Sequence, residues 1–285
     1  MSPVVARSYL YVPGDREEVL RKAHLRGADA LILDLEDAVA PARKHQARDT
    51  VRAFLTGPPP PGRFWVRVNA DQVEADVAAV AAPSIDGIFV PKAEPELLRD
   101  IDLLLTAAEG RLGLADGTFQ VVALIETARG LLRATEVAAA PRVLRLGIGE
   151  ADLAGELGLQ PGPDRTELAP IRSQVVVASA AASITAPVGP VETALRDPER
   201  LERTTRTLLR QGFRARTAIH PGQLPLINEV FTPSPAEIEA ARDVLDRLAR
   251  AERDGSGVAT DADGRLLDRA VVRAASEVLR RAGTR

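Results

Sequence analysis

The chain has 285 residues, of which 45% are hydrophobic and 27% charged, and its formal net charge is −3. This is enough apolar material for a large buried core, whereas the lack of a basic excess argues against a nucleic-acid partner, which would present a dense row of phosphates. Cysteine is absent, which excludes disulfides, thiolate nucleophiles and cysteine-ligated metals.

Membrane insertion is not expected, because no apolar stretch approaches the roughly 20 uncharged residues of a transmembrane helix. The first residues, "MSPVVARSYLYVPGDR", also lack the basic start and continuous apolar run of a signal peptide. We therefore expect a soluble, cytoplasmic protein.

Short apolar runs rich in β-branched residues alternate with charged amphipathic stretches, a pattern typical of βα units. Helices are predicted between the strands, for example over 16–27 and 197–212. The second of these has Asp197 as a plausible N-cap, Pro198 at the first helical position and Gly212 as its stop. The predicted strands lie within 8–14, 30–37, 63–70, 86–94, 119–127, 143–152, 185–193, which is the weakest, and 214–222.

About eight βα units in roughly 220 residues is the stoichiometry of a (β/α)8 TIM barrel, an α/β fold. The competing architecture is a doubly wound open sheet, which would normally need fewer strands and two layers of helices. We predict the barrel as a catalytic domain over residues 1–233.

The pattern changes in the last fifty residues. A long helix is predicted over 236–255, then a Gly/Asp-rich turn over 255–264 and a final helix over 265–283. Residues 234–285 are therefore predicted to form a C-terminal helical extension, which packs on the barrel or on a neighbouring subunit.

Charged and polar side chains follow most of the predicted strands. Because all strands of a parallel barrel point the same way, residues at their carboxyl ends converge on one opening, where active sites of this fold lie. The candidates at these ends are Asp34, Glu36, Asp37, Arg67, Asn69, Lys92, Glu94, Glu126, Asp152 and His220.

Several carboxylates at one opening repel each other unless a cation or protons compensate their charge. Oxygen ligands without cysteine favour a hard ion such as Mg²⁺, which takes one or two carboxylates and completes its shell with water and substrate. Glu126 and Asp152, from adjacent strands, are the natural pair. Alternatively, these acids cap helices or form ion pairs with Arg67 and Arg129.

Four further features suggest anion, carbonyl or proton-transfer chemistry. Arg67 could hold a substrate carboxylate in two-point fashion, or form a structural salt bridge. The glycine-containing turn Gly149–Asp152 could donate backbone N–H groups to a second carboxylate or an oxyanion. Lys92 could form a Schiff base with a carbonyl substrate, or simply neutralise Glu94 or Asp34. His220 could act as a base, or be hydrogen-bonded to the backbone.

In chain order, the segments "RSYLYVPGDR", "GADALILDLEDAVAPARKHQAR", "FWVRVNA", "VPKAE", "ALIETARGLL", "RLGIGEADLAGELG" and "AIHPGQLPLINEVFTPSPAEIEAA" resemble the HpcH/HpaI aldolase and citrate lyase family. The likeness is to its citrate lyase β-subunit (CitE-like) and malyl-CoA or citramalyl-CoA lyase branch. It covers nearly the whole chain, and it implies a barrel with an added C-terminal helical segment that assembles as a homotrimer.

The resemblance also implies roles for residues. Glu126 and Asp152 would be Mg²⁺ ligands, Arg67 would hold the oxo-acid carboxylate, and Glu36 and Asp37 would order Arg67 and metal-bound waters. The backbone of Gly149, Glu150 and Ala151 would support the same carboxylate, and His220 would lie at the substrate site. Arg16 and Lys22 would contact the CoA thioester, and Asp268 would act as acid or base from a neighbouring subunit.

Two departures from the family pattern concern Asp268 and the thioester. The methionine that usually precedes the aspartate and the proline that follows it are absent, as is the lysine often found before "IHP". The implied reaction is reversible, Mg²⁺-dependent cleavage of a citryl-, citramalyl- or malyl-CoA (or acyl-carrier-protein) thioester to an acetyl thioester and an α-keto acid. The rivals are a malyl-CoA thioesterase or condensing enzyme with the same metal site, a Schiff-base aldolase using Lys92, and a subunit active only with partner subunits and a carrier.

Overall fold

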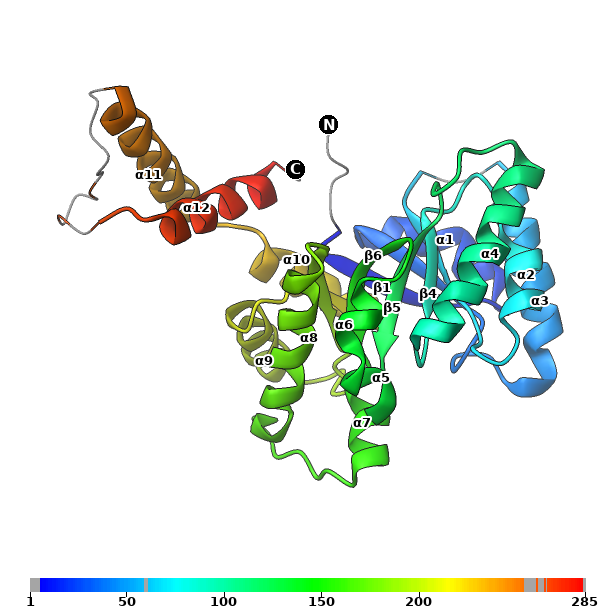
Figure 1. Ribbon diagram of the computed structural model, residues 1–285. Helices are drawn as coiled ribbons and strands as arrows, with labels where there is room; N and C mark the ends of the chain where they lie inside the picture. Colours follow the sequence, from blue (N-terminus) through cyan, green and yellow to red (C-terminus); the bar gives the residue numbers. More distant parts are fainter. Residues whose placement is uncertain (1–5, 59–60, 254–259, 261–263, 265, 284–285) are drawn as a thin grey trace. The chain divides into compact units, whose positions relative to one another are not determined.

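The computed structural model describes residues 6–58, 61–253, 260, 264 and 266–283. Eight parallel strands close into a barrel in sequence order, from β1 to β8, and β1 pairs with β8 through Tyr9 and Thr217. The predicted TIM barrel with a C-terminal helical segment is therefore confirmed (Figure 1). The strands are β1 Ser8–Pro13, β2 Ala30–Asp34, β3 Phe64–Arg67, β4 Gly87–Val90, β5 Gln120–Ile125, β6 Val143–Ile148, β7 Thr185–Gly189 and β8 Ala215–Ala218.

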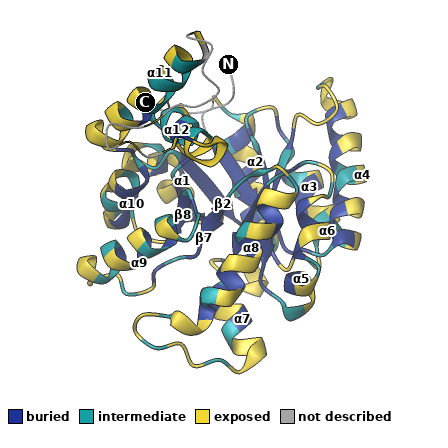
Figure 2. Cartoon of the chain, turned by 60° about the vertical axis from the view of Figure 1, so that its left-hand side comes forward, coloured by how far each residue is buried: buried dark blue, intermediate teal, exposed yellow. Residues whose placement is uncertain are grey.

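Helices connect successive strands and cover the barrel with their apolar faces, as the alternation of buried and exposed residues in Figure 2 shows. Short 3-10 turns occupy His24–Arg26, Pro41–Arg43, Thr166–Leu168 and Pro221–Gln223. The helices of this part are α1 Glu17–Ala23, α2 Lys44–Thr56, α3 Val73–Val80, α4 Pro95–Leu112, α5 Ala128–Leu132, α6 Ala134–Ala138, α7 Glu150–Leu157, α8 Ala169–Ala181, α9 Pro198–Arg210 and α10 Leu224–Phe231.

The interior of the barrel is filled by large side chains from several strands. Tyr9, Trp65 and Phe89 are almost fully buried and meet edge to face, with ring centroids 5.3–6.3 Å apart. Such contacts add to the free energy gained by burying the rings. The lower part of the barrel is therefore closed, and the space for a ligand lies at the opposite, carboxyl end of the strands.

The sequence signals at α9 are confirmed in detail. The Asp197 carboxylate accepts a hydrogen bond from Arg200 N at 2.9 Å, Pro198 is the first helical residue, and Gly212 follows the helix at a φ of 104°. The preceding strand is shorter than predicted, because β7 ends at Gly189 and the next residue, Pro190, has no N–H to continue the ladder.

Residues 229–285 cluster as a second compact unit, apart from Ala6–Asn228, so the division falls within α10. Its helices α11, Pro235–Arg253, and α12, Arg269–Ala282, pack against each other. The final helix begins later than predicted, because the Asp268 carboxylate caps it. The Gly/Asp-rich turn predicted over 255–264 lies outside the described residues except for 260 and 264. No helix in the described part of the chain is both long and apolar enough to cross a membrane.

Candidate active site

The main cavity lies at the carboxyl ends of the barrel strands and has a volume of about 610 Å³, a size typical of small-molecule sites. Arg67, Glu126 and the turn Gly149–Asp152 all line it. The strand-end rule therefore located this site, and the structure brings together the two predicted metal ligands and the predicted carboxylate-binding arginine.

Glu126 directly follows β5 and is only 6% exposed. Its Oε2 accepts a hydrogen bond from the backbone N–H of Lys92 at 3.1 Å. Burial raises the pKa of the Glu126 carboxyl to about 7; the Lys92 hydrogen bond opposes this rise, and the negative charge of Asp152 adds to it. A cation between the two acids would offset both the cost of burying the charged Glu126 carboxylate and its repulsion by Asp152.

Asp152 lies in the first turn of α7, one turn after β6. Gly149 leaves room for the acid of the neighbouring strand, since a Cβ built on Gly149 would stand 2.5 Å from Glu126 Oε1. Among the described residues, no three His, Asp or Glu side chains gather into a metal site of their own. Two carboxylates facing an open cavity nevertheless suit Mg²⁺, which keeps water and substrate in its shell.

The alternative in which Glu126 and Asp152 are partners of arginine is wrong within the described part of the chain. Arg67 is paired with other acids, and Arg129 Nε lies 3.1 Å from Glu94 Oε2. Neither Glu126 nor Asp152 forms an ion pair with a described Lys or Arg. Their charges are therefore left for a ligand.

Arg67, at the end of β3, is held mainly by Asp34. Nε and Nη2 donate to the two Asp34 oxygens at 2.7 and 2.6 Å, and the guanidinium stacks 4.6 Å from the centre of the Tyr11 ring. Burial acts to lower the pKa of Arg67, but the hydrogen bonds to Asp34 and the negative charges of the neighbouring groups together outweigh it and raise the pKa, so the group stays charged. The Nε and Nη2 atoms, which were expected to hold a substrate carboxylate, thus bind Asp34 instead. The remaining nitrogen, Nη1, contacts two other acids.

Glu36 and Asp37 are those acids. Arg67 Nη1 lies 2.9 Å from Glu36 Oε2 and 3.2 Å from Asp37 Oδ2. Glu36 is largely buried, and burial raises its pKa to about 7, against the opposing charge of Arg67. The Asp37 side chain is 75% exposed and lines the cavity. Both acids therefore contact Arg67, but only Asp37 reaches the cavity wall.

The turn Gly149–Ala151 offers its backbone to the cavity. It forms the N-terminus of α7, which has no side-chain cap, and first-turn N–H groups of a helix bind anions. The Glu150 carboxylate is engaged by two arginines, with Oε2 accepting from Arg165 at 3.1 Å and Oε1 accepting from Arg172. Glu150 and Ala151 can therefore contribute only through their main chain.

Two predicted side chains lie outside the cavity lining. Lys92 is exposed, with a φ of 49° that brings its N–H to Glu126. His220 is exposed, and its Nδ1 accepts from Gly222 N at 3.1 Å. The backbone-bonded alternative for His220 is thus the one observed. Lys92 acts on this site through its main chain, which removes the support for a Schiff-base mechanism.

Arg16 and Lys22 lie elsewhere on the barrel unit. Arg16 lines a separate, open depression before α1, and Lys22 is exposed on that helix. Asp268 belongs to the C-terminal unit, where its Oδ1 accepts from Ala270 N and Val271 N at 2.8 and 2.9 Å as the N-cap of α12. Their contacts with a thioester stay predictions.

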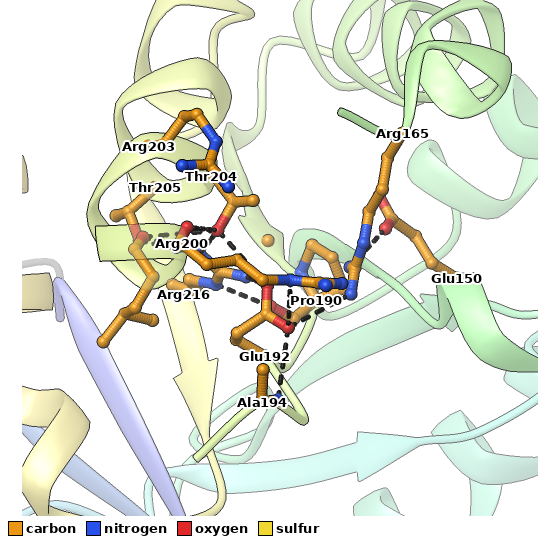
Figure 3. A network of polar contacts seen from close by, with 12 residues as sticks. Glu150, Arg165, Pro190, Glu192, Ala194, Arg200, Arg203, Thr204, Thr205 and Arg216 are labelled. Atoms are coloured by element: carbon orange, nitrogen blue, oxygen red, sulfur yellow. Dashed lines mark hydrogen bonds and ion pairs between the residues drawn. The ribbon is translucent and has the colours of Figure 1, made fainter. Parts of the chain in front are cut away.

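A buried network at the cavity wall, shown in Figure 3, was not predicted from the sequence. Glu192, just after β7, is fully buried and forms ion pairs with Arg165, Arg200 and Arg216. The strand-end rule would have found Glu192, because it ends the predicted strand 185–193. Arg165 lies in a loop without hydrophobic periodicity, so no pattern marked it.

Comparison with known proteins identifies the family of the chain. Residues 7–221 match the HpcH/HpaI aldolase/citrate lyase profile. A (3S)-malyl-CoA thioesterase of Cereibacter sphaeroides is 39% identical over 280 residues, covering 97% of this chain and 94% of that protein.

Two solved structures from Mycobacterium tuberculosis are also similar. CitE in complex with magnesium, acetoacetate and coenzyme A is 31% identical, with a TM-score of 0.76 over 97% of this chain and 98% of that one. A citrate lyase β-subunit complexed with oxaloacetate and magnesium is 30% identical, with a TM-score of 0.66 over 80% of this chain and 97% of that one. From the barrel, the strand-end acids and these likenesses together, the chain belongs to the HpcH/HpaI aldolase/citrate lyase family.

Proposed function

We propose that the chain is a Mg²⁺-dependent carbon–carbon lyase that cleaves a 3-hydroxy-3-carboxyacyl thioester of CoA to an acetyl thioester and an α-keto acid. The observation that carries this proposal is the cavity in which Glu126, Asp152, Arg67 and the N-terminus of α7 meet. Relatives crystallised with magnesium and coenzyme A or oxaloacetate support the same chemistry.

Glu126 and Asp152 would hold the Mg²⁺. When bound, the ion supplies a positive charge next to the substrate oxygen that becomes the keto group. The two carboxylates come from adjacent strands, and Gly149 lets the Glu126 side chain lie beside the turn after β6. This geometry fits an ion that takes one or two carboxylates from the protein.

The chain orients the substrate with two rigid groups of donors. Arg67 is fixed by Asp34 and Tyr11 and lines the cavity, so its guanidinium, whose Nη1 also contacts Glu36 and Asp37, would keep a constant position beside the carboxylate of the keto-acid half. The first-turn N–H groups of α7 add a rigid donor set for the same carboxylate. Fixed donors stabilise developing charge without reorganising during the reaction, which is the main source of electrostatic catalysis.

The reaction moves one proton from the substrate hydroxyl and delivers one to the carbon of the acetyl group. Breaking the carbon–carbon bond leaves its electron pair on the acetyl thioester as an enolate, and an acid must protonate that carbon. We propose Asp268 for this role, acting from a neighbouring subunit of a homotrimer. The trimer, the cytoplasmic location and the contacts of Arg16 and Lys22 with CoA are part of this proposal.

A second candidate is hydrolysis of the thioester, favoured by the 39% identity to a (3S)-malyl-CoA thioesterase. The same cavity could bind malyl-CoA, but water would then attack the thioester carbon and release free CoA. The two reactions differ in their products, since a lyase releases an α-keto acid and keeps the thioester intact.

The decisive experiment incubates the purified protein with malyl-, citramalyl- and citryl-CoA and Mg²⁺, and measures keto acid and free thiol in the same sample. We expect keto acid without free thiol, and loss of both Mg²⁺ binding and activity in Glu126→Gln and Asp152→Asn. Free thiol without keto acid would establish the thioesterase instead. Turnover that requires an acyl carrier protein and partner subunits would indicate a complex-dependent subunit.

A further inference from the structure

One wall of the cavity that also contains Glu126 and Asp152 carries an excess of positive charge. Four arginines surround two glutamates there, and all six side chains are at least two-thirds buried. The group consists of Glu150, Arg165, Arg172, Glu192, Arg200 and Arg216. Buried charges need partners, and here two cationic charges are not balanced within the group.

Two of the four arginines serve the fold. Arg216 is fully buried, and its guanidinium donates to Pro190 O at 2.9 Å and to the hydroxyls of Thr204 and Thr205 at 2.8 and 2.7 Å. Burial, opposed by the charge of Glu192 and helped by that of Arg165, lowers the pKa of Arg216 to about 10. Arg172 lies beneath Glu150 and does not line the cavity.

The other two, Arg165 and Arg200, line the cavity that also contains Glu126 and Asp152. They approach the Glu192 carboxylate from opposite sides (Figure 3), with Arg165 Nη2 and Arg200 Nε at 3.3 and 3.2 Å from Glu192 Oε1. Glu192 is thus shared, and its pKa is lowered because the arginines outweigh the effect of burial. It holds both guanidinium groups at the cavity wall without neutralising both.

Arg200 has donors left over. Its Nη1 and Nη2 form no hydrogen bond or ion pair with the described residues, and its side chain is 29% exposed. Arg165 is placed by an unusual backbone, with a φ of 54° that L residues rarely adopt. A long cationic side chain with free terminal nitrogens, held on a partner acid at the wall of a cavity, is ready to accept an anion.

We propose that Arg165 and Arg200 bind a second carboxylate of the substrate, so that the keto acid formed is a dicarboxylic one of the oxaloacetate type. This inference rests on the proposed function, because the first carboxylate is the one placed near Arg67 and the metal. The same cavity is also lined by small and apolar groups, among them Val188, Gly189 and Val191. Such a lining suits a short carbon chain that carries a carboxylate at each end.

A carboxylate of the acyl group is favoured over a phosphate of CoA as the anion. Arg165 and Arg200 share one cavity with the proposed metal ligands, whereas Arg16, which the family resemblance assigns to CoA, lines a different depression. A phosphate bound by Arg200 would affect all CoA thioesters equally. A carboxylate bound there would affect only acyl groups that carry one.

The test uses three thioesters that differ only in the substituent on the carbinol carbon. Citryl-CoA carries a carboxymethyl group there, citramalyl-CoA a methyl group and malyl-CoA a hydrogen. For Arg200→Gln we expect kcat/KM with citryl-CoA to fall about 10- to 100-fold, the range of one charged hydrogen bond. The values with the other two should fall far less. Arg203→Gln, an exposed arginine on the same helix that does not line the cavity, is the control.

An equilibrium measurement keeps the result independent of turnover. With Mg²⁺ present, wild-type protein should bind oxaloacetate more tightly than pyruvate, and Arg200→Gln should remove that preference. Arg200→Lys, which keeps the charge but not the planar fork, should retain part of it and shows that the position tolerates substitution.

Three results would overturn the inference. The first is an unchanged ratio between oxaloacetate and pyruvate in Arg200→Gln, with both still bound; this would leave the proposed function standing. The second is weaker binding of free CoA in that variant with keto-acid binding intact, which would assign the arginines to a phosphate. The third is wild-type protein that binds neither keto acid, which would remove the proposed function as well.

Discussion

Asp34 accepts two parallel hydrogen bonds from Arg67, Nε to Oδ1 at 2.7 Å and Nη2 to Oδ2 at 2.6 Å, and the Asp34 side chain is only 1% exposed. Its carboxylate also accepts from Glu36 N at 2.9 Å and Ala38 N at 3.1 Å. Asp34 therefore fixes both the arginine and the loop after β2.

The Asp34→Asn variant should be strongly destabilised, because an amide cannot accept both guanidinium bonds and the buried Arg67 charge loses its partner. We expect the free energy of unfolding to fall by about 3–5 kcal/mol, measured by urea denaturation. Asp37→Asn is the comparison: its side chain is 75% exposed, so the loss should stay below about 1 kcal/mol. Equal losses in the two variants would contradict the role given to Asp34.

Gly149→Ala tests the packing between the turn and Glu126. The new Cβ would stand 2.5 Å from Glu126 Oε1, so the carboxylate must move. We expect Mg²⁺ affinity to fall by about 10- to 100-fold, as for other changes that misplace a ligand, measured by isothermal titration calorimetry.

Gly155→Ala provides the matched control for Gly149→Ala. Gly155 lies in the same helix, and a Cβ there would meet no atom within 4 Å. This variant should bind Mg²⁺ normally and gain slightly in stability, since alanine favours the helix. If Gly149→Ala also bound Mg²⁺ normally, Glu126 would not be a ligand.

The sequence was sufficient to predict the barrel and one side of its cavity. Eight apolar runs with intervening amphipathic stretches define the fold, and parallel strands necessarily bring their ends together, so Arg67, Glu126 and Asp152 were expected at one opening. These inferences depend on the hydrophobic periodicity, which can be read from the sequence, and on the parallel topology that follows from it.

The pairing of side chains could not be predicted in the same way. Three acids, Asp34, Glu36 and Asp37, follow one strand, and only the geometry of the loop decides that Asp34 binds the Arg67 fork. Arg165 is placed by a left-handed backbone in a loop, a conformation that no repeat marks. The partners of a charge depend on long-range packing, so the arginine-rich wall had no signal in the sequence.

The protein without metal should lose stability as the pH rises toward neutrality. Burial raises the pKa of Glu36 from 4.5 to about 7 in the folded state, although the charge of Arg67 opposes this. The folded protein therefore holds this proton more tightly than the unfolded chain. The resulting stabilisation is complete below about pH 4.5 and is lost as the pH rises through 7.

Glu36→Gln should flatten this pH dependence, because the glutamine does not titrate. The difference between variant and wild type should change by about 1–3 kcal/mol between pH 5 and 8, measured by urea unfolding in EDTA. The unfolding free energy of the variant should still fall somewhat as the pH rises, since burial also raises the pKa of Glu126. Parallel curves for the two proteins would show that Glu36 titrates normally.

The role proposed for Asp268 can be separated from its part in the fold. Its Oδ1 accepts from two backbone N–H groups at the start of α12, so Asp268→Ala should destabilise that helix by about 1 kcal/mol. Serine is an equally good N-cap but carries no carboxyl group, and Asp268→Ser should therefore keep the stability of wild type. If Asp268 protonates the acetyl carbon, both variants should lose turnover by about 10²- to 10⁴-fold, measured as keto acid released from the CoA thioester. Activity retained in Asp268→Ser but reduced in Asp268→Ala would instead show that the residue serves only as a cap.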